Sequence, residues 1–178
     1  PFWTAMLGGI KEEMEAKGMD VDSQLVTVDA NSDQATMNNY VNDLIAQEVD
    51  AIILAPMDCT AVTEALQACE DAGIPVISYD RLIKSDAVSY YISFDNYTVG
   101  TLQGQYVIDT LDLDNAGDKT YNIEFTAGDP ADNNAGYFFN GAYDTLKPYL
   151  DAGTLNVVSG QTDFDSVATA QWDTQTAL

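Results

Sequence analysis

The chain has 178 residues, of which 46% are hydrophobic, so it can bury a core. Its 29 acidic residues against six basic ones give a formal net charge of −23. A surface this negative repels phosphate backbones and anionic headgroups, which argues against nucleic acid and membrane surfaces as partners. No apolar stretch reaches the length that spans a bilayer.

Histidine is absent, which excludes nucleophilic triads with a histidine base and metal sites built on histidine. Chemistry with carboxylates, tyrosines or lysines stays open. The two cysteines, Cys59 and Cys69, mark the ends of one predicted helix. At ~1.5 Å rise per residue they lie about 15 Å apart, beyond the ~7 Å that a disulfide spans. We therefore expect both to be packing residues.

The sequence starts without a methionine or a signal peptide, and it stops a short way into a helical pattern. We expect a fragment or a processed piece of a longer protein. The lack of a leader then says nothing about secretion.

Strand-like and helix-like stretches alternate along the whole chain. The predicted strands lie at residues 24–28, 51–54, 75–79, 90–94, 121–126 and 155–158. The predicted helices lie at 2–17, from Ser32 or Asp33 to about Ile45, from Asp58 or Thr60 to Gly73, from about 97 to 111, from the loop at 127–133 to about 149, and from near Ser166 onwards. Short apolar strands between helices of this length are typical of an α/β fold with a parallel sheet covered on both faces.

The single arginine, Arg81, directly follows Asp80 at the end of the apolar strand 75–79. In open α/β sheets, ligands bind at the carboxyl ends of the strands. Arginine offers a rigid fork of donors and aspartate offers acceptors, a combination that suits a polyhydroxylated ligand. The alternative is an ion pair at the strand end that faces solvent.

The loop GDPADNN at 128–134 follows a strand and precedes a helix. It has four hydrogen-bonding side chains, more than the capping of one helix requires. We expect at least one of them to contact a ligand. The pair Asp129 and Asp132 has the chemistry of an acid and a base, but nothing in the sequence supplies a nucleophile or raises one pKa.

Trp3 and Trp172, the two tryptophans, each lie near the start of a predicted helix. An indole ring can lie flat on the C–H face of a sugar ring. Packing in the core is the alternative for both.

The stretch DLDNAGDK at 112–119 resembles the opening of a calcium loop, with Asp112 and Asp114 at its first and third positions and Asp118 further on. Alanine at the fifth position and Ile123 at the twelfth remove two ligands, so we expect an acidic turn between two lobes. No phosphate-binding glycine motif occurs, and we expect no cofactor.

Four motifs follow one another in order: VISYDRLI at 76–83, YYISFDNYTVG at 90–100, GDPADNNA at 128–135 and LKPYLDAG at 146–153. Together they closely resemble the periplasmic sugar-binding proteins of ABC transporters, above all the xylose-binding and multiple-sugar-binding members. The resemblance implies the type 1 fold, in which two Rossmann-like lobes hold a monosaccharide between them. It places a first lobe without its first strand at 1–112, a crossover at 113–119 and an incomplete second lobe at 120–178.

The resemblance also implies a set of sugar ligands, two from each lobe and two aromatic residues: Asp80, Arg81, Asp132, Asn134, Trp3 and Trp172. Asp95 and Asn96 belong to a family motif that we interpret as a helix cap. Phe2 stands where the relatives have a charged or polar residue, which implies a changed sugar preference.

The expected function is binding, with no enzymatic step. The chain would hold an aldopentose or aldohexose and deliver it to the membrane subunits of an ABC importer, with a chemoreceptor or sensor kinase as a further partner. Its expected location is extracytoplasmic, in the periplasm or as a cell-surface lipoprotein. The alternative is the sugar-sensing domain of a LacI-type regulator or of a chemosensory system. The acidity and the absence of a basic helix-turn-helix argue against a regulator that acts on DNA.

Overall fold

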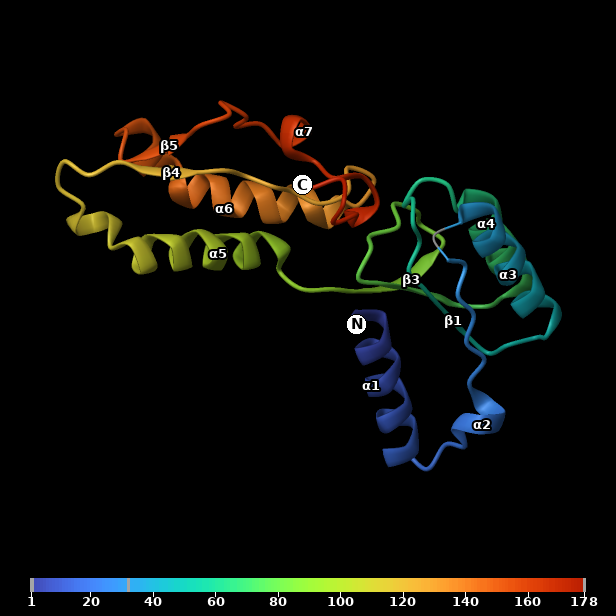
Figure 1. Cartoon of the computed structure of the whole chain (residues 1–178). Coiled ribbons are helices and arrows are strands. Elements are labelled where there is room, and N and C mark those ends of the chain that lie inside the picture. The colour runs from blue at the N-terminus through green and yellow to red at the C-terminus, as the bar shows by residue number, and fades with distance from the viewer. Residues whose placement is uncertain (1, 32, 178) are drawn as a thin grey trace. The chain divides into compact units, whose positions relative to one another are not determined.

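A computed structural model describes residues 2–31 and 33–177, which form two separate compact units (Figure 1). The first unit, residues 2–31, contains helices α1 (Phe2–Ala16) and α2 (Val21–Gln24). Gly18 has a φ of 75°, a conformation that glycine adopts without a steric cost, and it follows α1 as the sequence predicts.

The strand predicted at 24–28 is wrong. Gln24 ends α2, and the following residues belong to no ladder. Leu25 does have extended backbone angles, φ −120° and ψ 113°, so the local preference for an extended chain is real. A strand also needs hydrogen-bonding partners, and Val26 and Val28 remain 51% and 49% exposed.

The second unit, residues 33–177, begins with a three-stranded parallel sheet in the order β1-β2-β3, which we call the first sheet. Its elements are α3 (Gln34–Ala46), β1 (Ile52–Leu54), α4 (Thr63–Ala72), β2 (Val76–Tyr79) and β3 (Val88–Ile92). One core joins both helices to the strands, and Val41, Leu66 and Val76 are each at most 3% exposed within it.

We predicted three ends for helices α3 and α4, and two of them are confirmed. The Asp33 carboxylate accepts from the Thr36 amide and caps α3, while Ser32 lies outside the described residues. Gly73 ends α4 in the left-handed conformation. The start predicted for α4 at Asp58 or Thr60 is wrong, because the Asp58 carboxylate instead accepts from the amide and hydroxyl of Thr60 and closes a turn ahead of the helix.

Two helices of the second unit cover one face of the first sheet, and cover of the other face stays a prediction. Helices α3 and α4 contact each other and share one core, so they cover the same face. Ile52 and Leu54 point into that core, whereas Ile53 between them is 45% exposed. Strand β3 is exposed along most of its length, with Tyr90 at 67%.

The rest of the second unit contains α5 (Asn96–Leu111), the 3₁₀ turn η1 (Leu113–Asn115), β4 (Tyr121–Ile123), α6 (Asn133–Asp151), β5 (Leu155–Val157), α7 (Phe164–Val167) and the 3₁₀ turn η2 (Ala170–Trp172). Strands β4 and β5 pair in parallel and form the second sheet. The helix predicted from near Ser166 onwards is present only as a single turn there. Asp163 caps the single turn α7, and the chain then continues as η2.

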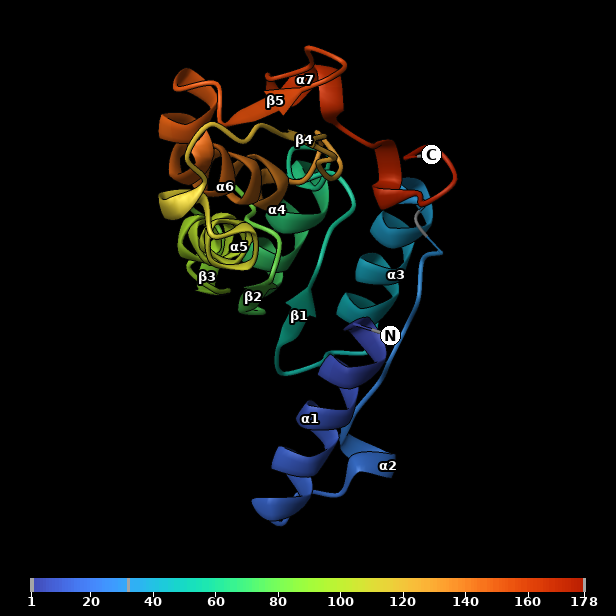
Figure 2. The ribbon, with the colours of Figure 1, turned by 60° about the vertical axis from the view of Figure 1, so that its left-hand side comes forward.

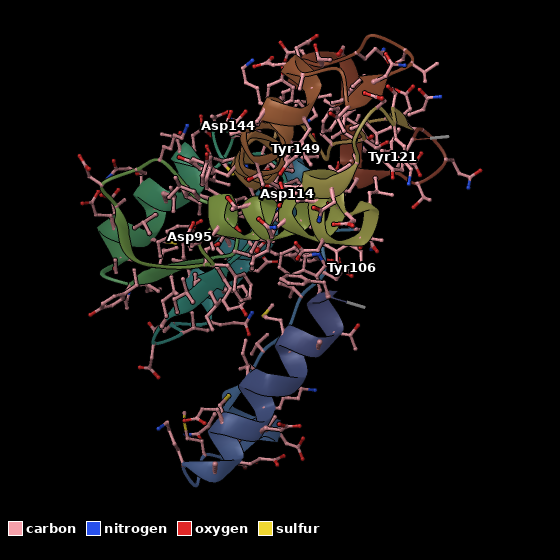
Figure 3. All side chains as sticks on the ribbon, turned by 90° about the vertical axis from the view of Figure 1, so that its left-hand side faces the viewer. Asp95, Tyr106, Asp114, Tyr121, Asp144 and Tyr149 are labelled. Carbon is pink, nitrogen blue, oxygen red and sulfur yellow. The ribbon has the colours of Figure 1, made fainter. Side chains whose placement is uncertain are left out.

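Helices α5 and α6 lie side by side, with α6 between α5 and the second sheet in both views (Figures 1 and 2). Their core includes Ile108 from α5, Leu146 from α6 and Leu155 from β5. Helix α5 therefore packs with the second sheet, although the sequence division at residue 112 places it in the first lobe. Tyr149 also donates its hydroxyl proton to Asp114, 2.5 Å away, which fixes the turn after α5 (Figure 3).

Glycines permit the close approach of α5 and α6. A Cβ on Gly100 would collide with the Phe138 carbonyl, and one on Gly141 would collide with the Tyr97 carbonyl. At Gly104 a Cβ would lie 2.8 Å from Thr145 Cβ. The two backbones thus touch along their lengths. No helix among the described residues has the length and apolar composition needed to cross a membrane.

We predict that Gly100→Ala or Gly141→Ala lowers the free energy of unfolding by about 1–3 kcal/mol, because the added methyl group pushes the helices apart. Gly136→Ala is the matched control in α6, since a Cβ there meets no atom within 4 Å. It should be neutral or stabilising by up to ~1 kcal/mol, from helix propensity. Urea denaturation followed by circular dichroism measures all three. Equal effects of the three substitutions would contradict the packing argument.

Candidate functional site

Arg81 lies directly after β2, at the carboxyl edge of the first sheet. It is only 7% exposed, so the alternative of a solvent-facing ion pair is wrong. Its Nη1 donates to the carbonyl oxygens of Pro56, 3.2 Å away, and Met57, 3.1 Å away, which follow β1. The side chain is therefore anchored between the ends of two neighbouring strands.

Asp132 brings the second sheet to this arginine. Its Oδ2 lies 3.5 Å from Arg81 Nε and accepts from Trp172 Nε1 at 3.1 Å. Its Oδ1 accepts from the Asn134 amide and caps α6. Asp132 is 4% exposed, so its charge depends on these donors rather than on water.

Asn134 makes a second connection between the two sheets. Its Nδ2 donates to the Asp80 carbonyl at 3.0 Å, and its Oδ1 accepts from Asn96 Nδ2 at 2.8 Å. Asn134 is 2% exposed. Its amide group therefore holds the strand end against the start of α6.

Asn96 is a residue of this site that sequence reasoning missed. Asp95 caps α5 by accepting from the Thr98 amide, as predicted, so the cap does not need Asn96. Asn96 is 7% exposed, and its Oδ1 is a buried acceptor that receives no hydrogen bond from the described residues. Burying an acceptor without a hydrogen bond costs folding free energy, unless a ligand or a water molecule donates to it. The sequence did contain a signal for Asn96: a second polar residue stands beside Asp95, which is enough to cap α5 by itself.

Asp80 has a left-handed backbone, with φ 63°. Its carbonyl oxygen accepts from Tyr91 Oη at 3.1 Å and Ser93 Oγ at 3.2 Å as well as from Asn134. Burial raises the pKa of the Asp80 carboxyl, the nearby Asp132 charge raises it further, and Arg81 opposes both. Asp80 is therefore a candidate ligand-binding residue, because its ionised form is disfavoured and it lies next to the buried Arg81–Asp132 pair.

Trp172 lies in the turn η2, where Gln171 and Trp172 both have positive φ, 58° and 54°. The indole is 43% exposed, so it is not a core residue. It lies so close to Gly128 that any Cβ there would collide with it, and it meets Phe138 edge to face at 6.4 Å between ring centroids. A partly exposed indole held beside a buried carboxylate suits the C–H face of a sugar.

Trp3 lies on α1 in the first unit. Its ring packs edge to face on Phe2, with 4.9 Å between the ring centroids. Its part in sugar binding stays a prediction.

Two carboxylates of the acidic turn at 112–119 accept hydrogen bonds from protein side chains. Asp112 ends α5 and accepts from Asn115, while Asp114 accepts from Tyr149. Across the part of the chain that the structure describes, no three acidic or cysteine side chains gather as a metal site. Cys59 and Cys69 are buried free thiols, as predicted, and burial raises the pKa of each.

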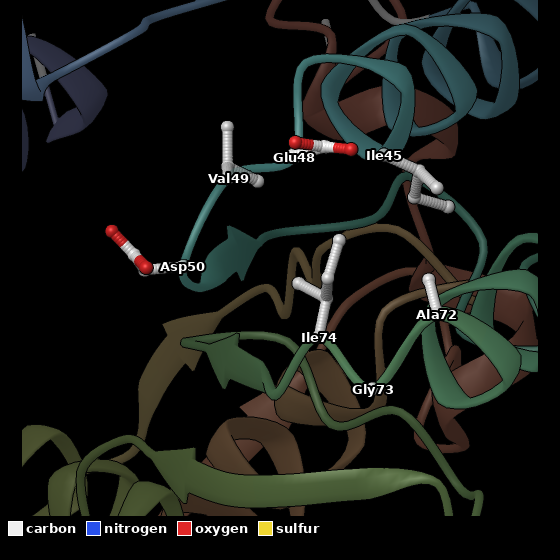
Figure 4. A pocket seen from close by; sticks show the side chains of 7 residues that line it. All are labelled: Ile45, Glu48, Val49, Asp50, Ala72, Gly73 and Ile74. Atoms are coloured by element: carbon white, nitrogen blue, oxygen red, sulfur yellow. The ribbon is translucent and has the colours of Figure 1, made fainter.

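A hollow of about 490 Å³ lies at the edge of the first sheet opposite to Arg81 (Figure 4). Asp50 and Ile74, which line it, precede β1 and β2. It therefore lies at the amino ends of the strands, whereas Arg81 lies at their carboxyl ends. Carboxylates and aliphatic groups line this hollow, and it shares no residue with the Arg81–Asp132 site.

The Arg81–Asp132 site combines acceptors, a guanidinium donor and an exposed indole at strand ends, the features expected for a carbohydrate. The sequence profile of the periplasmic binding protein domain matches residues 1–178. The chain belongs to this family. Its two parallel sheets with flanking helices are those of the type 1 periplasmic binding protein fold.

The relatives of this chain include proteins with sugar-binding names. The chain is 42% identical over 93% of its length to the multiple sugar-binding periplasmic protein SbpA of Azospirillum brasilense, and spans 45% of that protein. It is 39% identical over 98% of its length to the multiple sugar-binding periplasmic receptor ChvE of Rhizobium radiobacter, and spans 48% of it. The chain thus spans about half the length of these relatives.

A solved structure agrees closely with the fold. An ABC transporter solute-binding protein from Clostridium phytofermentans, crystallised with β-D-glucose, has a TM-score of 0.88 and 39% identity. That match covers 98% of this chain and 52% of the other.

We predict that Asp80→Asn raises the free energy of unfolding at pH 7. The raised pKa means that the folded chain holds this proton more tightly than the unfolded chain does. Stability therefore falls as pH rises from the ordinary value of 3.8 through the raised one, and the cost is fully present above it. Asparagine removes the charge and tolerates the left-handed backbone. Urea denaturation at pH 7 and near pH 3 measures the difference, which should vanish in acid.

Asp95→Asn provides the control of opposite sign. The side-chain and backbone hydrogen bonds from Thr98 lower the pKa of Asp95, so its contribution is present above the ordinary value of 3.8 and is lost as pH falls. Asp95→Asn should therefore lower stability at pH 7. If both substitutions shift stability in the same direction, the assignment of Asp80 as a strained carboxylate is wrong.

Proposed function

We propose that this chain binds a monosaccharide, an aldopentose or aldohexose, between the carboxyl ends of its two sheets. The observation that carries the proposal is the contact of Arg81 after β2 with Asp132 before α6, next to the Trp172 indole. Buried groups of both charges beside an aromatic ring are what a neutral polyhydroxylated ring requires.

The chemistry of the proposed site is binding. Each oxygen of Asp132 has two lone pairs and is engaged once or twice by protein donors, so a sugar hydroxyl can still donate to it. Asp80 adds a carboxylate, and a hydroxyl that donates to it partly offsets the cost of its burial. A hydroxyl that both donates and accepts becomes polarised, which strengthens the whole set.

Sugar binding would also favour one arrangement of the two sheets. Arg81–Asp132 and Asn134–Asp80 already join them, and a ring that contacts both would add to these contacts. A ligand shifts a conformational equilibrium by its differential affinity for the two states. The closed arrangement would then be the form that the membrane subunits of an ABC importer recognise, in an extracytoplasmic setting like that of the periplasmic relatives.

Isothermal titration against D-xylose, D-glucose, L-arabinose and D-galactose tests the proposal. We expect saturable binding of at least one of them with no chemical change in the sugar. A folded protein that binds none of the four, or one that converts a sugar to a product, would overturn the proposal.

Arg81→Ala should weaken sugar binding by more than ~2 kcal/mol, because it removes the charged partner of Asp132 and a donor to the sugar hydroxyls. The matched control is Lys84→Ala, which removes the same charge at an exposed position three residues along. It should leave the affinity within about 0.5 kcal/mol.

Because Arg81 is buried against Asp132, the alanine variant risks unfolding. Arg81→Lys keeps the charge but replaces the planar fork by a point charge, so it should fold and still bind more weakly. Unchanged affinity in Arg81→Lys and in a folded Arg81→Ala would remove Arg81 from the site.

A further inference from the structure

Asp129 is a buried carboxylate that the proposed sugar site does not use. It is 6% exposed and lies in the loop between β4 and α6. Its Oδ1 accepts from the Ala131 amide at 2.9 Å, within its own loop. Its Oδ2 accepts from the Gln171 amide, also at 2.9 Å, from a segment far along the chain. One carboxylate therefore ties two loops together through backbone donors.

The turn that Asp129 holds is unfavourable by itself. Gln171 and Trp172 have positive φ values in succession, although both have a Cβ that disfavours the left-handed region. Such a pair persists only where its surroundings impose it. The Gln171 amide points to Asp129, and the Trp172 amide donates to the Thr169 carbonyl at 3.2 Å.

The same two loops meet at three further points. The Ala127 amide donates to the Val167 carbonyl at 2.8 Å, and the Thr169 amide donates to the Gly128 carbonyl at 3.0 Å. The Trp172 indole then lies against Gly128, with its Nε1 donating to Asp132. Asp129 is the one side chain in this set whose charge anchors the turn that aims the indole.

We propose that Asp129 is a positioning residue, which sets the direction of the Trp172 indole by holding the left-handed turn at Gln171. The expected contact of this indole with sugar rests on the proposed function. The role of Asp129 in placing the indole does not. The placement itself can be measured without any sugar.

Asp129→Asn removes one of the two acceptor oxygens at nearly constant volume, so an amide nitrogen must face one of the two backbone donors. The matched control is Asp163→Asn. The Asp163 carboxylate accepts from the Ser166 amide a few residues before Trp172, and no hydrogen bond joins it to Trp172. The probe is the indole N–H resonance of Trp172 in the sugar-free protein, assigned with Trp172→Phe, and the Trp3 indole serves as the internal reference.

In Asp129→Asn we expect the Trp172 indole resonance to move toward that of a free indole and its hydrogen exchange to quicken about tenfold, as its hydrogen bond to Asp132 loosens. The Trp3 resonance should stay in place, and Asp163→Asn should change neither. Adding Gln171→Gly, which accepts the left-handed turn without strain, should restore part of the Trp172 signal. An unaltered Trp172 resonance in Asp129→Asn would overturn the inference.

Two further measurements keep the inference separate from the proposed function. If Asp129→Asn does not fold, hydrogen exchange of the Gln171 amide in the unaltered protein tests the contact. The amide of this exposed residue should exchange slowly because it donates to Asp129, and fast exchange would refute the contact. With a sugar that the unaltered protein binds, Asp129→Asn should weaken binding about tenfold while Asp163→Asn does not. If no sugar binds at all, the proposed function fails, and the indole measurement still tests Asp129.

Discussion

The contact between the Arg81 guanidinium and the Asp132 carboxylate is the interaction on which the rest of the site depends. Asp132 is a buried charge in a chain with a net charge of −23, and Arg81 is the only arginine available to it. Breaking a buried pair of this kind typically costs about 3–5 kcal/mol, because the remaining charge stays without a partner. The pair therefore stabilises the arrangement in which the end of β2 lies against the loop before α6.

This constraint extends outward through both sheets. The carbonyls that follow β1 hold Arg81 Nη1 while its Nε faces Asp132. Asp132 keeps its orientation because its other oxygen caps α6. Helix α6 in turn lies against α5 at a distance that Gly100 and Gly141 allow. The glycines of a helix contact thus help to position the N-terminus of α6, where Asp132 meets Arg81.

Local sequence signals predicted the features that local physics determines. Asp33, Gly73 and Asp95 end or begin helices as expected, because capping involves residues within one turn. The strand expected at 24–28 failed because a ladder needs a partner from elsewhere. The motif resemblance brought together Arg81, Asp132, Asn134 and Trp172, whereas Asn96 was interpreted only as part of a helix cap and the contact of Asp129 with Gln171 was not predicted. Their decisive hydrogen bonds reach 38 and 42 residues along the chain, and no local pattern encodes them.

Apart from the Asn96 side-chain oxygen, the buried polar groups around Arg81, Asp132 and Asn134 have protein partners before any ligand arrives, and this favours binding. A site whose groups are already oriented loses little conformational entropy when it binds a ligand. Asp80 differs in one respect, since burial and the Asp132 charge make its ionised form costly in the folded chain. A ligand whose hydroxyl groups donate hydrogen bonds to this carboxylate lowers the free-energy cost of keeping it ionised in the folded chain. The burial that weakens the unliganded fold is therefore the same burial that strengthens its hold on a polyhydroxylated ring.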